Sequence, residues 1–247
     1  MIFNTNEGQK WAWATGEEPI IQPNTKGAGI MVSDFIEQYD GFLRLPEFQA
    51  KHVGLPSTAR VLLEYGAVKE GYWNSERFVK NVKNAVAIAE YKYPATRNTL
   101  VSIFDQSSCH KAFSDDALNV SRMNVRPGDK QPCLRDTVWA GHVQRMVDDN
   151  GVPKGMKAIL EECGINTERM KADDMRTVLS FHEDFANEKT IVEKLITGKG
   201  HKCLFLPKFL CELNPIERVW EQAKVYSRAH TNFILVGLRS IVNTALS

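Results

Sequence analysis

Three short apolar segments limit what this chain can fold into. They occupy residues 28–36, 99–104 and 203–206, and each is too short for an ordinary helix but long enough for a buried strand. A longer segment between Ser75 and Pro94 repeats its apolar side chains at helical spacing, with Ser75 as the expected N-cap. Strands that alternate with helices predict an α/β fold, in which a mixed sheet is flanked by helices.

Two further apolar runs, at residues 41–45 and 60–65, extend this order. The first follows a turn and is expected to be a strand. The second is too short for its periodicity to distinguish a strand from a short helix. From about residue 111 to residue 200 the pattern is less regular, and we interpret this stretch as an insertion between core elements.

Two carboxylates stand out by their positions in this order. Asp105 directly follows the segment 99–104, at the carboxyl end of a strand, where α/β sheets place their active groups. Asn214 and Pro215 predict the start of a late helix, as its N-cap and first residue. Glu217 lies in the first turn of that helix and points away from its apolar face, so it is free to meet a side chain from a strand end.

A pair of converging carboxylates is the ligand set that Mg²⁺ or Mn²⁺ requires. Magnesium prefers hard oxygen ligands, and two such ions can activate an attacking oxygen and stabilise a leaving one on phosphorus. Asp105 and Glu217 are therefore candidate metal ligands. The alternative is structural, because an Asp after a strand can serve a turn and a Glu in a first helical turn interacts favourably with the helix dipole.

The charge distribution is compatible with a basic surface in one region of the chain, but the protein as a whole is not strongly basic. The 247 residues carry a formal net charge of +1, which is weak for a nucleic-acid-binding protein. Acidic side chains outnumber basic ones in residues 148–193, whereas basic ones dominate in residues 201–247. Lys208, Arg218 and Lys224 are candidate phosphate contacts in this basic region, although a solvated helix face explains them equally well.

Cysteine usage and hydropathy exclude several classes of protein. The five cysteines form no CxxC pair, which disfavours a structural zinc site. We recognise no signal peptide, so free thiols in a reducing compartment are expected. No apolar run approaches the length of a membrane span, so we expect no membrane partner.

Three motifs in the chain resemble those of a known family. Residues 104–110 place an Asp at a strand end five residues before a His, and residues 206–220 contain Leu-Pro and then Leu-Asn-Pro-Ile-Glu before a Trp. Residues 29–35 add an apolar strand that ends in Ser-Asp-Phe. These segments resemble the catalytic domain of the Tc1/mariner-like transposases of the DDE superfamily. The resemblance spans essentially the whole chain and is weakest in its middle third.

The resemblance implies a ribonuclease-H-like fold over a single domain of residues 1–247. It implies an endonuclease and strand-transfer activity that cuts DNA at the ends of a transposable element and integrates them into a target. An acidic triad with Mg²⁺ or Mn²⁺ would perform this chemistry, with Asp105 as its second member and Glu217 as its third. The resemblance also implies that the protein binds DNA, that it forms a possible homodimer and that it acts in the nucleus.

The chain departs from the family pattern in two places. The interval between Asp105 and Glu217 is longer than in most relatives, and the extra length falls in the insertion at about 111–200. The first Asp of the triad would fall upstream of Met1, so we expect the chain to lack the first strand and the helix-turn-helix DNA-binding region. Loss of this Asp should impair catalysis, because one metal ion loses a bridging ligand.

Several alternatives follow from this departure. Asp34 is a candidate substitute metal ligand, as is Glu7, although a structural Asp34 and a solvated Glu7 are the simpler interpretations. Trp11 and Trp13 form an aromatic pair that could stack on bases or pack on an edge strand. The competing function is a non-catalytic remnant or domesticated domain that binds DNA or protein. A ribonuclease-H-like nuclease of another family ranks last, because it would not contain the Leu-Asn-Pro-Ile-Glu motif.

Overall fold

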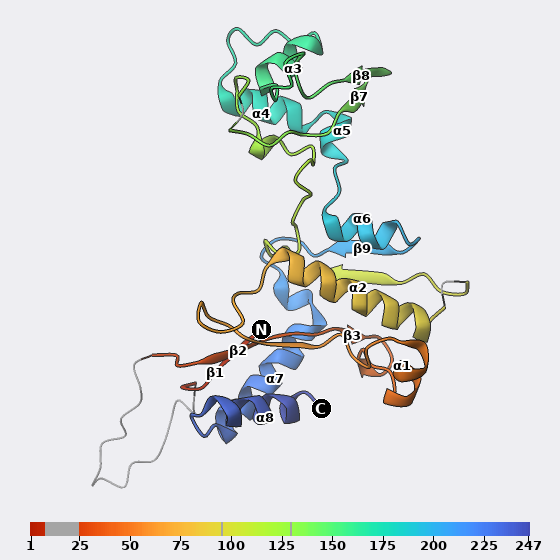
Figure 1. Cartoon of the computed structure of the whole chain (residues 1–247), viewed down its shortest axis with the longest axis vertical. Coiled ribbons are helices and arrows are strands. Elements are labelled where there is room, and N and C mark those ends of the chain that lie inside the picture. The colour runs from red at the N-terminus through yellow and green to blue at the C-terminus, as the bar shows by residue number, and fades with distance from the viewer. Residues whose placement is uncertain (8–24, 95, 129) are drawn as a thin grey trace. The chain divides into compact units, whose positions relative to one another are not determined.

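The computed structural model describes residues 1–7, 25–94, 96–128 and 130–247 (Figure 1). Over these residues it is an α/β protein with eight α-helices, which agrees with the predicted α/β class, but its strands form several small separate sheets where one mixed sheet was expected. The chain divides into two compact units. The first comprises Met1–His110 with Leu195–Ser247, and the second comprises Lys111–Lys194.

The second unit occupies most of the stretch that the sequence predicts to be an insertion. The predicted pair Trp11 and Trp13 lies outside the described residues. Within the described part of the chain, no helix is both long enough and apolar enough to cross a membrane.

The first unit contains a three-stranded antiparallel sheet. In sheet order its strands are β1 (Ile2–Asn4), β2 (Gly29–Ser33) and β5 (Val61–Glu64). Ile2–Asn4, which the sequence predicted to be the end of a strand, form β1 and pair with β2. The sequence pattern of residues 60–65 did not distinguish a strand from a short helix, and in the structure this segment contains strand β5. Alternation along these strands buries Phe3, Ile30 and Val32 on one face of the sheet, whereas Leu63, which pairs with Met31, is buried on the other face.

The predicted strand at residues 28–36 is shorter than expected. It breaks after β2 because the Asp34 carboxylate accepts a hydrogen bond from the Phe35 amide at 2.8 Å, which turns the chain locally. A separate two-stranded hairpin follows, and its strands are β3 (Ile36–Glu37) and β4 (Gly41–Phe42).

The first unit also contains a separate pair of parallel strands, one of which ends directly before Asp105. Its strands are β6 (Val101–Phe104) and β9 (Lys202–Phe205). The long helix α2 (Ser75–Lys92) packs against it, with the rings of Phe78 and Phe104 edge to face at 5.6 Å. The predicted N-cap of α2 is wrong by one residue, since the Asn74 side chain accepts the Arg77 amide at 2.9 Å.

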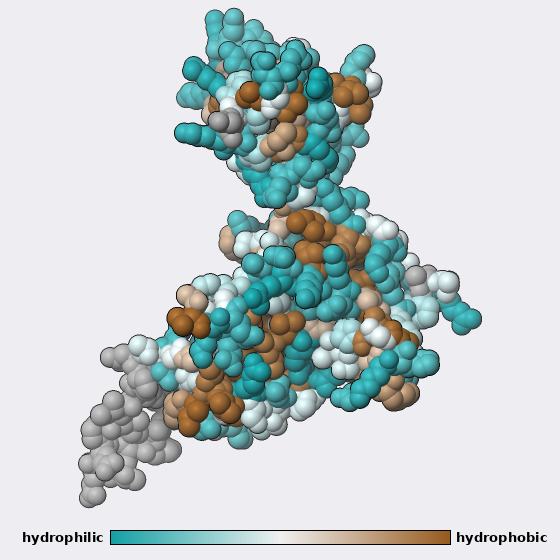
Figure 2. Space-filling model, viewed as in Figure 1, coloured by the Kyte–Doolittle hydropathy of each residue, from teal (hydrophilic) through white to brown (hydrophobic). Residues whose placement is uncertain are grey.

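The opposite face of this strand pair reaches the surface. Its exposed side chains are Val101, Ile103 and Leu204. Figure 2 shows hydrophobic residues reaching the surface of the first unit in several places among hydrophilic ones.

Two C-terminal helices cover the antiparallel sheet. They are α7 (Pro215–His230) and α8 (Leu235–Ala245), and they lie together beside β1 and β2 (Figure 1). Trp220 of α7 and Leu238 of α8 are buried against Phe3 and Ile30 of the sheet. Helix α1 (Glu47–Val53), which the sequence did not predict, contributes Ala50 to a separate cluster that includes residues of α2.

The second unit has a hydrophobic core of its own. Its helices and strands are β7 (Thr137–Trp139), β8 (His142–Gln144), α3 (Met156–Glu162), α4 (Ala172–Ser180) and α5 (Glu183–Ala186), while α6 (Ile191–Thr197) continues into the first unit. The core includes the fully buried side chains Met146, Met156, Leu160 and Leu179. The two chain segments at its base lie side by side, since the Ile191 amide donates to the Ala112 carbonyl at 2.9 Å.

Candidate functional site

The two predicted catalytic carboxylates lie at the end of a strand and at the start of a helix of the first unit. Asp105 follows the last residue of β6, and the Gln106 side chain donates to the Leu206 carbonyl at 2.9 Å, which ties this end of β6 to the end of β9. A loop then runs from Leu206 to Asn214, and Glu217 lies in the first turn of α7. Asn214 is the N-cap residue and Pro215 is the first residue of the helix, as predicted, but the Asn214 side chain makes no capping hydrogen bond.

The α-amino group of Met1 interacts electrostatically with both carboxylates. It is partly buried and donates to the Val32 carbonyl at 2.9 Å. Burial lowers the pKa of this amino group, whereas the negative charges of Glu217 and Asp105 raise it, so both lie close enough to act on it. The beginning of β1, the end of β6 and the start of α7 therefore carry groups that influence one another electrostatically.

Asp105 is held as an ionised carboxylate. Its Oδ1 lies 2.6 Å from His110 Nδ1 and accepts the Ser107 amide at 2.9 Å. The hydrogen bond from His110 outweighs the opposing effect of partial burial, and the pKa of Asp105 falls to about 2. The imidazole of His110 in turn stacks on Phe78 at 4.1 Å, so helix α2 fixes the side chain that orients Asp105.

Replacing His110 with alanine should raise the pKa of Asp105 from about 2 toward its ordinary value of 3.8, because its main hydrogen bond is lost. The folded pKa of Asp105 lies below this ordinary value. Its ionised form therefore stabilises the fold above about pH 4, and that contribution is lost as the pH falls toward 2. Carboxyl-carbon NMR titration measures the change, with the exposed His52→Ala as control. An unchanged Asp105 pKa in His110→Ala would contradict this assignment.

Asp34 is a buried ion-pair partner in the structure. Its carboxylate has no exposed surface and lies 2.5 Å from Arg60 Nε, whose side chain is 12% exposed. Burial raises the pKa of Asp34, and the attraction of Arg60 does not fully offset it. Glu7, the other proposed substitute, accepts a hydrogen bond from the Asn4 side chain at 2.7 Å. We therefore do not include either residue in the candidate site.

The donor chemistry of the site suits a hard divalent cation, although the ligand set is small. Asp105 and Glu217 supply carboxylate oxygens, which Mg²⁺ and Mn²⁺ prefer. Among the described residues, no group of three or more His, Cys, Asp or Glu side chains is placed to hold a metal ion. A cation at this site would therefore have Asp105 and Glu217 as its carboxylate ligands.

The candidate phosphate contacts lie close in the sequence to these carboxylates. Lys208 and Arg218 are exposed, and half-buried Lys224 is close enough to the Met1 amino group to lower its pKa. Sequence reasoning overlooked Phe209, whose ring is 86% exposed and lies 5.1 Å from the Lys208 ammonium group. The sequence feature that could have identified Phe209 is its position as an aromatic residue in the loop between the Leu-Pro and Leu-Asn-Pro-Ile-Glu motifs.

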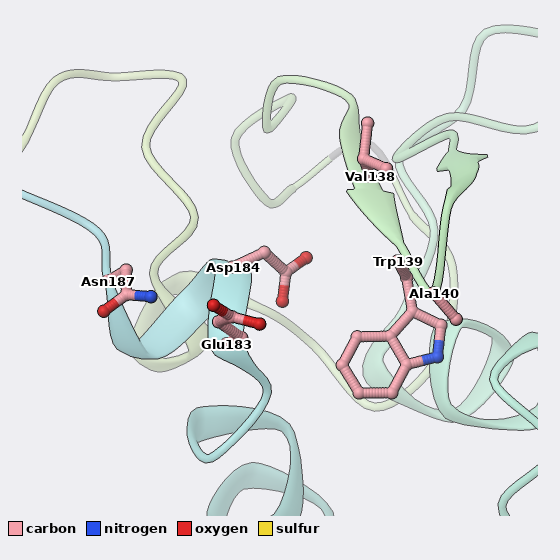
Figure 3. A pocket seen from close by; sticks show the side chains of 6 residues that line it. All are labelled: Val138, Trp139, Ala140, Glu183, Asp184 and Asn187. Carbon is pink, nitrogen blue, oxygen red and sulfur yellow. The ribbon is translucent and has the colours of Figure 1, made fainter.

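The second unit contains a separate shallow hollow beside the β7–β8 hairpin. Figure 3 shows Glu183 and Asp184 of α5 on the side of the hollow opposite Trp139. The Trp139 ring stacks on His182 at 4.0 Å, which fixes its orientation. No sequence motif predicted this hollow.

Comparison of the chain with protein-family models, with curated proteins and with solved structures finds no match.

Proposed function

We propose that this chain is a DDE-type transposase catalytic domain with a ribonuclease-H-like fold. Its ancestral reaction is metal-dependent phosphoryl transfer on DNA, and the described residues provide an impaired form of that site. The observation that supports the proposal is the position of Asp105 at the end of β6, which the Gln106 side chain ties to the end of β9, and of Glu217 in the first turn of α7. The first unit contains both antiparallel and parallel strand pairs, which belong to separate small sheets.

The residues have distinct roles in the proposed reaction. Asp105 and Glu217 would hold Mg²⁺ or Mn²⁺, which when bound would polarise a phosphoryl oxygen and favour attack on phosphorus. His110 and the Ser107 amide keep Asp105 ionised and in one orientation. Lys208, Arg218 and Lys224 would neutralise phosphates of the DNA backbone, which supplies most of the non-specific affinity.

A non-catalytic DNA- or protein-binding domain is the second candidate. It is favoured by the absence of a third carboxylate near Asp105 and Glu217 among the residues of known placement.

Calorimetric titration with Mn²⁺ tests the proposed site directly. The intact chain should bind Mn²⁺, and Asp105→Asn and Glu217→Gln should each weaken binding by about tenfold or more, because each removes one of two ligand charges. Glu221→Gln is the matched control, since Glu221 is exposed one turn further along α7.

The outcomes separate the two candidate functions. Equal Mn²⁺ affinity in the intact chain and both site variants would refute the site. Absence of Mn²⁺ binding by the intact chain would favour the non-catalytic domain. Nicking of supercoiled DNA with Mn²⁺ that depends on Asp105 and Glu217 would support retained catalysis.

A further inference from the structure

The loop between β9 and α7 runs from the strand that pairs with β6, which Asp105 follows, to the helix that carries Glu217. It leaves β9 beside Asp105, where the Leu206 amide donates to the Phe104 carbonyl at 2.8 Å. It ends at Asn214, whose carbonyl accepts the Glu217 amide at 3.0 Å. The backbone of the loop is therefore hydrogen-bonded at one end to β6 and at the other end to the first turn of α7.

Phe209 at the tip of this loop projects into solvent from a fixed backbone. Its φ angle is +68°, which is unfavourable for a bulky side chain, and its ring is 86% exposed. The Leu210 amide donates to the Pro207 carbonyl at 3.3 Å, and the Leu213 amide donates to the Leu210 carbonyl at 3.2 Å. These turns hold an aromatic ring outward, where it gains little from burial, and such strain is often retained for function.

The charge beside Phe209 indicates the chemistry of its partner. The Lys208 ammonium group lies 5.1 Å from the ring centroid, and Arg218 is exposed on the first turn of the following helix. An aromatic face next to cationic side chains is the combination that binds single-stranded nucleic acid, with the ring on a base and the cations on phosphates. A purely apolar protein partner would leave these cations without compensation.

We propose that Phe209 stacks on an unpaired DNA base next to the candidate site, while Lys208 contacts an adjacent phosphate. This inference rests on the proposed function for its choice of DNA as the partner. It goes beyond the proposed function by specifying DNA that contains an unpaired or terminal base. The ring can stack fully only on a base that has left the duplex or lies at its end. Phe209 thus acts as a positioning residue that selects DNA with unpaired bases.

Fluorescence anisotropy without divalent metal tests the inference independently of catalysis. The probes are a blunt DNA duplex and the same duplex with a single-stranded 3′ overhang. The intact chain should bind the overhang duplex more tightly, and Phe209→Ala should weaken that binding by about tenfold while leaving blunt-duplex binding unchanged. Phe209→Trp should keep the preference, and the fluorescence of the new indole should be quenched on binding the overhang.

A matched control and a fold check accompany these variants. Phe48→Ala removes another exposed phenyl ring, 72% exposed on α1, and should change neither affinity. Circular dichroism melting should show equal stability for the intact chain, Phe209→Ala and Phe209→Trp.

Several results would overturn the inference. Equal overhang affinity in the intact chain and Phe209→Ala would do so, as would an intact chain that binds neither duplex. A Phe209→Ala change that alters only the oligomeric state would instead assign the ring to a contact between copies of the chain. If Mn²⁺ binding still depends on Asp105 and Glu217 in any of these cases, the stacking role fails and the proposed metal site stands.

Discussion

Replacing Arg60 with methionine should lower the free energy of unfolding of the first unit by about 3–5 kcal/mol. The Asp34 carboxylate is completely buried, and the Arg60 guanidinium at 2.5 Å is its ionic partner. Methionine keeps much of the apolar volume but removes the charge, so an uncompensated carboxylate remains in the interior. Breaking a buried pair in this way costs more than replacing both partners with apolar side chains.

Arg60 also helps to fix the C-terminal end of α8. Its Nη2 donates to the Leu246 carbonyl at 2.7 Å, and Arg44 donates to the same carbonyl. The guanidinium of Arg60 lies 4.6 Å from the centroid of the Phe42 ring. The variant therefore loses a cation–π contact and one of two donors to the end of α8, in addition to the ion pair.

Urea denaturation at several pH values tests this expectation. The pKa of Asp34 is already raised by burial, and loss of Arg60 should raise it further. An acid with a raised folded pKa destabilises the fold as the pH rises through that pKa, so the loss at pH 7 should shrink near pH 4. The double variant Asp34→Leu with Arg60→Met should recover much of the stability. A loss in Arg60→Met that is the same at both pH values would contradict a buried-charge origin.

Replacing Arg135 with methionine should destabilise the second unit by about 3 kcal/mol. Glu188, whose side chain is 2% exposed, pairs with Arg135 and lies 2.7 Å from Lys194. Burial alone would raise the pKa of Glu188, but these two cations hold it below its ordinary value. Without Arg135 the carboxylate keeps only Lys194, which is 42% exposed and therefore a weaker partner.

Hydrogen exchange on the whole chain locates the effect of Arg135→Met. Amides of residues 111–194 should exchange faster, whereas those of β2 and α2 in the first unit should keep their protection. Arg145→Met is the matched control, since Arg145 is 58% exposed and lies 3.8 Å from Asp149, a pair that contributes little. Uniform acceleration in both units would show that the two do not unfold separately.

The sequence predicted the strongly periodic parts of the fold. The α/β class, helix α2 and the helix that begins at Pro215 followed from hydrophobic spacing and from an Asn-Pro signal. The β7–β8 hairpin was missed because its turn at Ala140 and Gly141 does not carry one of the common hairpin sequences. Helix α1 was missed because a seven-residue helix offers too little periodicity.

Local sequence signals predicted some residues of the candidate site, but they could not predict contacts between residues that are distant in the sequence. Asp105 and Glu217 were predicted because each follows a local signal, a strand end or a helix start. The pairing of Asp34 with Arg60 depends on strand register across β2 and β5, which local sequence does not specify. The exposure of Phe209 depends on a positive φ angle that few phenylalanine residues adopt, so no propensity rule anticipates it.

The hydrogen bond between Ile191 and Ala112 has a consequence for how the chain can change in length. Because the second unit begins and ends at adjacent backbone positions, a gene could gain or lose it as one cassette without pulling β6 and β9 apart. The number of residues that separate Asp105 from Glu217 along the chain therefore carries no information about how far apart the two carboxylates lie. A search for relatives that fixes this interval would overlook proteins that hold the same two side chains on the same two elements.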